Sequence, residues 1–194
     1  TIKSNIYASA INTLTIKPSV GNTPVITGNN DTAVISFAGA DYVSIDGSNT
    51  VGGISRDLTI TTSTAVATDS YVIRFYSPNA ADGATQDAIM NCNIIGNIVT
   101  STAIMSGGFI PGSVSDAQNN NNRFINNAIS KAQSGIALLG GGPDQANEIT
   151  GNSIGSAIVS DKLSNTGILI NGQSLCFVQN NTITGIINSG TANV

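Results

Sequence analysis

Apolar residues return along the second half of the chain in a short pattern that occurs four times. Each copy alternates large apolar residues with small or polar ones and contains a Gly-Asn or Asn-Asn pair. The copies are Cys92–Val99, Asn122–Ile129, Asn147–Ile154 and Cys176–Ile183. Such alternation predicts a β-strand with successive side chains on opposite faces. Because Gly and Asn tolerate positive φ, the pair predicts a corner at which the chain changes direction.

The spacing of the copies predicts a solenoid. Aligning the second Asn of each pair gives spacings of 30, 25 and 29 residues between Asn97, Asn127, Asn152 and Asn181. Periods of this length without helical periodicity between them are typical of one coil per repeat. Equivalent residues would then stack about 4.8 Å apart, and we expect these four asparagines to form a ladder of hydrogen-bonded amides. Such a ladder stabilises a solenoid without implying a ligand.

The same alignment predicts two columns of core residues. Three residues before each anchor Asn the chain has a large apolar residue, namely Ile94, Phe124, Ile149 and Val178. Two residues after each anchor it has a β-branched residue, namely Val99, Ile129, Ile154 and Ile183. We expect both columns to point into one continuous interior.

The N-terminal third contains further β-branched segments bounded by turn residues, and each predicts a strand. They are Thr13–Lys17, Val25–Thr27, Ala33–Phe37, Tyr42–Asp46, Asp57–Thr61 and Tyr71–Phe75. Residues 1–194 are therefore expected to form a single all-β domain. Its predicted fold is a right-handed parallel β-helix of about seven coils and roughly 30 to 35 Å in length.

Three longer segments and the two ends complete the predicted architecture. Ser77–Asp87, Gly107–Asn121 and Gly140–Ala146 are rich in Gly, Pro, Asp and Asn, so we expect loops that protrude from corners on one face. Neither end shows a capping helix or a charged strand, and uncapped coils expose strand edges and apolar core. The chain is therefore expected to be a fragment of a longer one, with further repeats or other subunits continuing the stack.

Charge and composition mainly exclude functions. The net charge is −4, and the seven basic residues are scattered, which disfavours nucleic acid as a partner. No apolar run approaches the length of a membrane span. The chain has no His and no metal-binding motif, so we expect no metal and no cofactor. A calcium ion held by Asp side chains and carbonyl oxygens of the loops is an alternative that no motif signals.

The two cysteines are predicted to be free. In the alignment Cys92 and Cys176 occupy one column three coils apart, which corresponds to about 14 Å. A disulfide needs Cα atoms within about 7 Å, so we expect two buried thiols that do not form a bond.

The acidic residues do not form a recognisable catalytic motif. A glycosidase needs two carboxylates about 5 to 9.5 Å apart across the bond that it cleaves. Asp41 and Asp46 flank one predicted strand, and Asp82 and Asp87 share one loop, but neither pair has a basic partner in a known pattern. Most of the other acids lie in turns, where Asp has a local structural use. We therefore expect no catalytic residue.

Some of the repeats resemble a known family. Ile149–Ile154 and Val178–Ile183, which alternate with Gly135–Leu139 and Gly167–Ile170, look like the right-handed parallel β-helix repeats of the pectate-lyase-like superfamily. The stretch from Thr15 to Ser48 is similar to segments of very large secreted surface proteins of Bacteroidetes-type bacteria. The resemblance implies the fold and an extracellular or cell-surface location. Family enzymes carry clustered Asp residues with Arg or Lys at the active cleft, and this chain does not match those positions.

Three functions remain open at this level. The first is a non-catalytic structural or adhesive module of an extracellular bacterial surface protein or assembly. The second is a domain that binds or cleaves polysaccharide along one strand face, and the third is a trimeric, tailspike-like fibre. Three acids and a base within about 8 Å of each other, with exposed aromatic residues nearby, would favour an enzyme. Scattered acids and open ends would favour the structural module.

Overall fold

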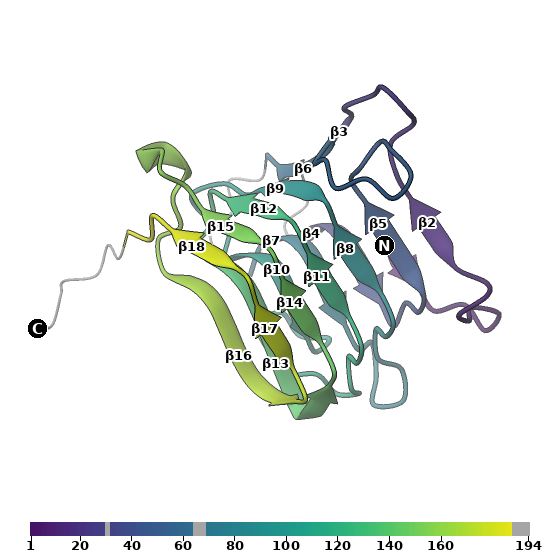
Figure 1. Cartoon of the computed structure of the whole chain (residues 1–194). Helices are drawn as coiled ribbons and strands as arrows, with labels where there is room; N and C mark the ends of the chain where they lie inside the picture. Colours follow the sequence, from purple (N-terminus) through teal and green to yellow (C-terminus); the bar gives the residue numbers. More distant parts are fainter. Residues whose placement is uncertain (30–31, 64–68, 188–194) are drawn as a thin grey trace, which may run out of the picture.

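Three parallel sheets, each with six strands, build the molecule (Figure 1). The structure is a computed structural model that describes residues 1–29, 32–63 and 69–187. Sheet I contains β1 (Ile2–Lys3), β4 (Ala33–Ala38), β7 (Tyr71–Tyr76), β10 (Thr102–Gly107), β13 (Ser134–Gln145) and β16 (Thr166–Ser174). Sheet II contains β2 (Leu14–Ile16), β5 (Val43–Asp46), β8 (Ala88–Met90), β11 (Arg123–Ile125), β14 (Glu148–Thr150) and β17 (Phe177–Gln179). Sheet III contains β3 (Val25–Gly28), β6 (Leu58–Thr62), β9 (Cys92–Ile95), β12 (Ala128–Ser130), β15 (Ser153–Gly155) and β18 (Thr182–Thr184).

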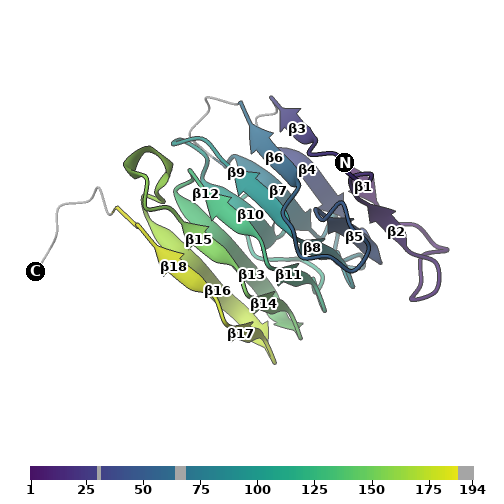
Figure 2. The same cartoon turned by 45° about the horizontal axis from the view of Figure 1, so that its top comes forward.

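One strand from each sheet makes one coil, so the chain is an all-β parallel β-solenoid, as predicted. Figure 2 shows the coils lying side by side in chain order, from β1–β3 at one end to β16–β18 at the other. The described residues form six coils, whereas about seven were expected. A coil is longer than the sequence spacing suggested because loops at the corners lengthen it. The first strands of successive coils begin 31 to 38 residues apart.

The core is a set of stacked columns inside the three sheets. In sheet I the strand register places one isoleucine above another, in the column Ile35, Ile73, Ile104, Ile136 and Ile168. Phe37 and Phe75 stack with ring centroids 4.3 Å apart, and Phe75 meets the edge of Phe124 at 5.3 Å. Equivalent apolar side chains therefore cover one another from coil to coil, which removes them from water.

Two corners of each of the last four coils use a residue with positive φ. Between sheets I and II these residues include Gln86, Asn121, Ala146 and Leu175, and between sheets II and III they are Asn91, Asn126, Gly151 and Asn180. The Asn-Asn and Gly-Asn pairs at 126–127, 151–152 and 180–181 therefore lie at corners, as predicted. Only Gly adopts this conformation without strain, and Asn tolerates it better than most residues.

The three segments expected to protrude as loops behave differently from one another. Gly140–Ala146 is not a loop, because residues up to Gln145 continue β13 and pair with β16 across an irregular register. Part of Gly107–Asn121 lies on the outer face of sheet I, where the carbonyls of Gly108 and Phe109 accept hydrogen bonds from Arg74. Ser77–Asp87 packs against this second segment, and the hydroxyl of Ser77 accepts a hydrogen bond from the backbone of Asp116. The segments are thus stacked in register at the corner between sheets I and II.

Among the described residues, no helix has the length and apolar character needed to cross a membrane.

Candidate functional site

A ladder of asparagine side chains joins four coils at the corner between sheets II and III. The Oδ1 atom of Asn127 accepts a hydrogen bond from the backbone N–H of Cys92 at 3.0 Å. Asn152 and Asn181 repeat this contact, accepting from the preceding ladder residue at 2.9 Å each. The Nδ2 atoms of Asn127 and Asn152 also donate to the next Oδ1, at 3.1 and 2.9 Å. Each side chain therefore satisfies backbone groups that the corner removes from the strand ladder.

Asn97 does not belong to this ladder, so the sequence alignment is wrong for its first copy. The strand register pairs Ile94 with Ile129, which places Cys92, not Asn97, in the column of Asn127. Asn97 lies half-buried after β9, where its backbone N–H donates to the hydroxyl of Thr100 at 2.7 Å. Matching the copies on identical residues shifted the first one by five positions.

The expected core residues occupy three kinds of position. Five of them are fully or almost fully buried in the interior, namely Ile94, Phe124, Ile149, Ile129 and Ile154. Val178 and Ile183 point the same way but are each 45% exposed, because they lie on the last described coil. Val99 was expected in the core but lies half-buried in the turn after β9, again because the first copy was misaligned.

A second ladder, at the corner between sheets I and II, was not predicted. Asn122 accepts from the backbone N–H of Asp87 at 3.0 Å, and Asn147 accepts from that of Asn122 at 2.8 Å. Their Nδ2 atoms donate to the carbonyls of Ala84 and Asn119. The sequence contains a signal for this ladder, since Asn122 and Asn147 each stand five residues before an anchor Asn.

Asp87 holds the same position in the second ladder without the amide group. Its Oδ1 accepts from the backbone N–H of Val43 at 2.8 Å, but Oδ2 is buried and has no hydrogen-bond partner. Burial raises the pKa of this carboxyl to about 8, and the nearby charge of Asp41 acts in the same direction. A raised pKa can indicate a catalytic acid. Asp87 is fully buried, however, so a substrate could not reach it, and the carboxyl acts as a structural substitute for Asn.

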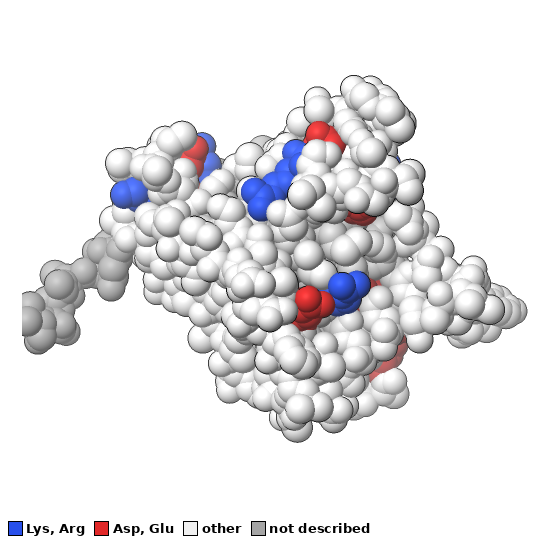
Figure 3. Space-filling model, viewed as in Figure 1, with Lys and Arg blue, Asp and Glu red and all other residues white. Residues whose placement is uncertain are grey.

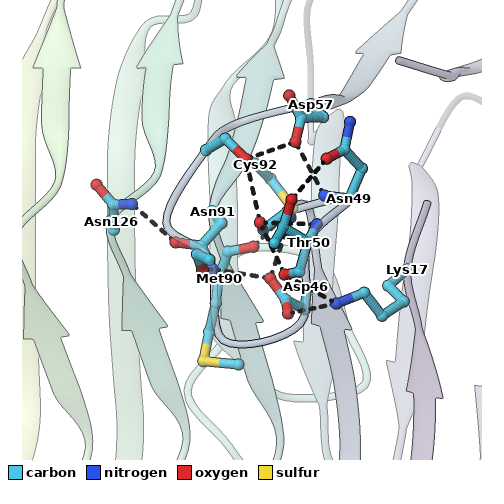
Figure 4. Close-up of polar contacts among 12 residues, drawn as sticks. Lys17, Asp46, Asn49, Thr50, Asp57, Met90, Asn91, Cys92 and Asn126 are labelled. Atoms are coloured by element: carbon cyan, nitrogen blue, oxygen red, sulfur yellow. Dashed lines mark hydrogen bonds and ion pairs between the residues drawn. The ribbon is translucent and has the colours of Figure 1, made fainter. Parts of the chain in front are cut away.

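Polar side chains also connect coils on the outside of the corner between sheets II and III (Figure 4). Asp46 accepts from Lys17 at 3.4 Å and from the Nδ2 of Asn91 at 2.7 Å. Asn126 donates to the Oδ1 of Asn91 at 2.7 Å and receives two hydrogen bonds from Arg56. This chain of contacts extends from the first coil to the fourth. The carboxylate of Asp46 in the second coil thus connects the first coil to the third.

The loop between β5 and β6 is closed by its own acidic residue. Asp57 accepts from the backbone N–H of Asn49 at 2.9 Å and from the hydroxyl of Ser55 at 2.6 Å. The hydrogen bond from Asn49, followed by that from Ser55, lowers the pKa of Asp57. Asp57 therefore stays ionised as a cap for the loop, which is a structural role.

The remaining acids that were considered for catalysis do not form a catalytic arrangement. Asp41 accepts a hydrogen bond from the hydroxyl of Thr85. Asp82 lies next to Gly39, so close that a Cβ on this glycine would clash with its carboxylate. Within the described part of the chain, no three His, Cys, Asp or Glu residues gather in a way that could hold a metal ion. The geometry thus assigns the acids to turns and corners.

Both cysteines are free, as predicted, but they occupy different columns. Cys92 lies in the column of Asn127, whereas Cys176 aligns with Asn147 because Phe177 pairs with Glu148. Burial raises the pKa of the Cys92 thiol to about 12. Cys176 is only partly buried, and burial raises the pKa of its thiol as well. Thiolate chemistry at neutral pH is therefore disfavoured at both positions.

Charges are sparse on the face formed by sheets II and III. Figure 3 shows large uncharged areas, with acidic and basic groups next to each other in several places. One such pair is Arg123 and Glu148, whose side chains meet at 3.0 Å across neighbouring strands. This face therefore offers no continuous charged patch for a polyion.

The last described coil leaves its interior side open. Ile170, Val178 and Ile183 are 41%, 45% and 45% exposed, whereas the residues above which they stack are buried. Leu138, Ile149 and Ile154 are those residues, and each is 0% exposed. Among the described residues, no side chain accepts from the backbone N–H of Asn181, whereas Asn181 itself accepts from that of Asn152. The other corner loses its side-chain acceptor one coil earlier, because Cys176 stands opposite Asn147. An apolar surface and unpaired strand edges thus coincide at this end of the described structure.

Comparison with protein-family models, with curated proteins and with solved structures finds no match.

Proposed function

We propose that this chain is a non-catalytic structural or adhesive β-solenoid module of an extracellular bacterial surface protein or assembly. The observation that carries the proposal is the open side of the last described coil, where inward-facing residues are exposed. A solenoid repeat buries its core only when another repeat stacks on it. The proposal includes a relation of this chain to pectate-lyase-like repeats and to large secreted surface proteins.

The use of the polar side chains supports a structural role over an enzymatic one. Asp46 and Asp57 hold a corner loop in place, and Asp87 substitutes for Asn in a ladder. An enzyme that cleaves a glycosidic bond would need two accessible carboxyl groups on either side of that bond. The side chains in these networks instead satisfy the backbone and bind one coil to the next.

The corners of the last coil indicate what kind of partner would continue the stack. In the preceding coils the N–H of a ladder residue donates to the corner Asn of the following coil wherever that coil has one, as Asn147 and Asn152 illustrate. A partner coil with Asn at both corners would accept from Cys176 and Asn181 in the same way. Its apolar side chains would cover Val178 and Ile183. The partner is either a further repeat of the same polypeptide or a coil of another subunit.

Adding one coil tests this proposal. The chain is extended after Thr184 with a copy of residues 156–165 followed by a copy of residues 134–155, which supplies both corner asparagines. We expect thermal unfolding to occur roughly 5 to 10 °C higher, because nearest-neighbour interfaces dominate the stability of repeat proteins.

The matched control carries the same extension with Ala in place of the copied Asn147 and Asn152. It should give a clearly smaller increase in melting temperature, because the added coil cannot accept from Cys176 and Asn181. An extended chain that melts no higher than the original would contradict the stacking role, and so would equal increases in both extended chains.

A further inference from the structure

Sheet I ends in an open edge at β16 (Figure 2). This strand pairs with β13 on one side, and β13 is its only strand partner among the described residues. Leu169 and Ile170 are 46% and 41% exposed, whereas Ala137 and Leu138, which lie opposite them in β13, are 3% and 0% exposed. One more strand alongside β16 would therefore remove apolar surface of both side chains from water.

The backbone of β16 also directs hydrogen-bonding groups to this edge. In a parallel sheet, alternate residues of a strand bond to the neighbouring strands on opposite sides. The N–H of Thr166 donates to the carbonyl of Gln133 in the preceding coil at 3.3 Å. The N–H and C=O groups of Gly167 and Leu169 consequently face the open edge. An edge of this kind is a template for a further strand.

The chain itself returns to this edge after β18. Ile186 forms a parallel bridge with Leu163, and the N–H of Ile187 donates to the carbonyl of Leu163 at 2.7 Å. The preceding coil passes the same corner in a similar way, because the N–H of Ser164 donates to the carbonyl of Ala132 at 3.2 Å. The corner from sheet III to sheet I thus stays in register with the coil before it, up to the last described residue.

Two independent alignments place the next residues on β16. Continued by three residues, the register of Ile186 on Leu163 sets Ser189 opposite Thr166, the first residue of β16. The sequence gives the same alignment. Three aligned strands begin with a hydroxyl residue followed by Ala or Gly, namely Thr102-Ala103, Ser134-Gly135 and Thr166-Gly167. Ser189-Gly190 repeats this start, and Ser-Gly-Thr-Ala at 189–192 differs from Ser-Gly-Ile-Ala at 134–137 in a single residue.

The second position of this start has no room for a side chain. A Cβ on Gly135 would lie 2.5 Å from the carbonyl oxygen of Gly167 in the next coil and 2.7 Å from Cγ2 of Ile154. A Cβ on Gly167 would lie 2.7 Å from Cγ2 of Ile183. Close packing of the coils therefore requires Gly in this column, and Gly190 meets the requirement.

We propose that residues 189–194 dock along the open edge of β16 as the first strand of a seventh coil. Ser189 lies opposite Thr166, and the N–H of Thr191 donates to the carbonyl of Gly167. The segment has no charged side chain, so docking buries none. For the stacking role proposed above, on which this consequence rests, the chain itself continues sheet I, and a partner meets the open edges of β17 and β18.

Hydrogen–deuterium exchange at the amides of Gly167 and Leu169 tests this docking in the full chain. The comparison chain ends at Ile187 and so keeps every described residue. We expect both amides to exchange at least tenfold more slowly in the full chain, because the added strand shields them. Equal rates in the two chains would overturn the proposal. A slowing that grows with protein concentration would overturn it too, since the strand would then come from a second copy.

Two proline variants test the register. In the proposed strand the N–H of Thr191 points to β16, whereas that of Ala192 points away from it. Thr191→Pro removes a hydrogen bond to β16 and should restore the fast exchange of the shortened chain. Ala192→Pro is the matched control, because it removes an N–H that β16 does not use, and it should keep the slow exchange. The same behaviour in both variants would contradict the proposed register.

The outcome is separate from that of the added-coil experiment, in which copied residues replace everything after Thr184. A higher melting temperature of that extended chain, together with equal exchange of Gly167 and Leu169 in the full and shortened chains, would leave the stacking role intact. The docking of residues 189–194 alone would then be contradicted.

Discussion

Asn127→Ala is expected to lower the free energy of unfolding by about 2 to 4 kcal/mol. The side chain is fully buried, accepts from the backbone N–H of Cys92 and donates to the carbonyl of Ile89 at 2.9 Å. Alanine would leave both backbone groups buried without a partner. The loss of a buried hydrogen-bonding group costs more than the mean value of a hydrogen bond, because the abandoned partner cannot reach water.

Urea denaturation of Asn127→Ala and Asn97→Ala measures this difference directly. Asn97 is half-exposed, so water can replace its contacts, and its substitution should cost about 1 kcal/mol or less. The two variants differ only in position within the repeat. Equal losses of stability would restore the alignment in which Asn97 belongs to the ladder, and would contradict the observed register.

Asp87→Asn is expected to stabilise the protein at alkaline pH. The carboxyl has a pKa of about 8 in the folded chain, against an ordinary value of 3.8. The folded state therefore holds the proton more tightly than the unfolded state does. Its contribution to stability is complete below pH about 4 and is lost as the pH rises towards 8, and it amounts to roughly 6 kcal/mol at most. An amide does not titrate, so this loss should be absent from the variant.

Denaturation of both proteins between pH 4 and 9 tests this prediction. The two should have similar stability near pH 4, and the variant should be more stable by several kcal/mol above pH 8. The new Nδ2 can also donate a hydrogen bond, as Asn122 does to Ala84. Burial raises the pKa of Asp144 too, so some pH dependence should remain in the variant.

Asp116→Asn is the control for this series, because Asp116 is exposed. It should reproduce the pH dependence of the original chain. If the curves of the original chain and of Asp87→Asn run parallel from pH 4 to 9, the buried carboxyl does not limit stability at alkaline pH.

Sequence periodicity predicted the fold because burial imposes the same requirement on every coil. All six N-terminal segments expected to be strands overlap observed strands, from β2 to β7. Ile129, Ile154 and Ile183 lie in one column because each stands two residues after a corner Asn. Such a column can be found in a sequence when the same residue type, here Asn, occupies the preceding corner in each coil.

The sequence could not fix the register where the corner residue changes. Cys92 occupies an Asn position, and an alignment on identical residues places Asn97 there instead. Asp87 was assigned to a loop for the same reason, although it holds a ladder position. The coil count was too high because the length of a corner loop, such as that closed by Asp57, follows no period.

The surroundings of Arg74 could not be predicted because they depend on residues that are far apart in the sequence. Arg74 lies in a strand whose alternation alone does not show what its guanidinium contacts. The carbonyls of Gly108 and Phe109 that accept its hydrogen bonds come from the segment after β10, which only the fold brings over β7.

Hydrogen–deuterium exchange at single-residue resolution tests the central claim, that corner side chains bind one coil to the next. The backbone N–H groups of Cys92, Asn122 and Asn127 donate to buried ladder side chains. These amides should exchange as slowly as those of the core strands, because both are exposed only by global opening. The amide of Asn97, bonded to Thr100 in a turn, should exchange much faster. Corner amides that exchange as fast as that of Asn97 would contradict the claim.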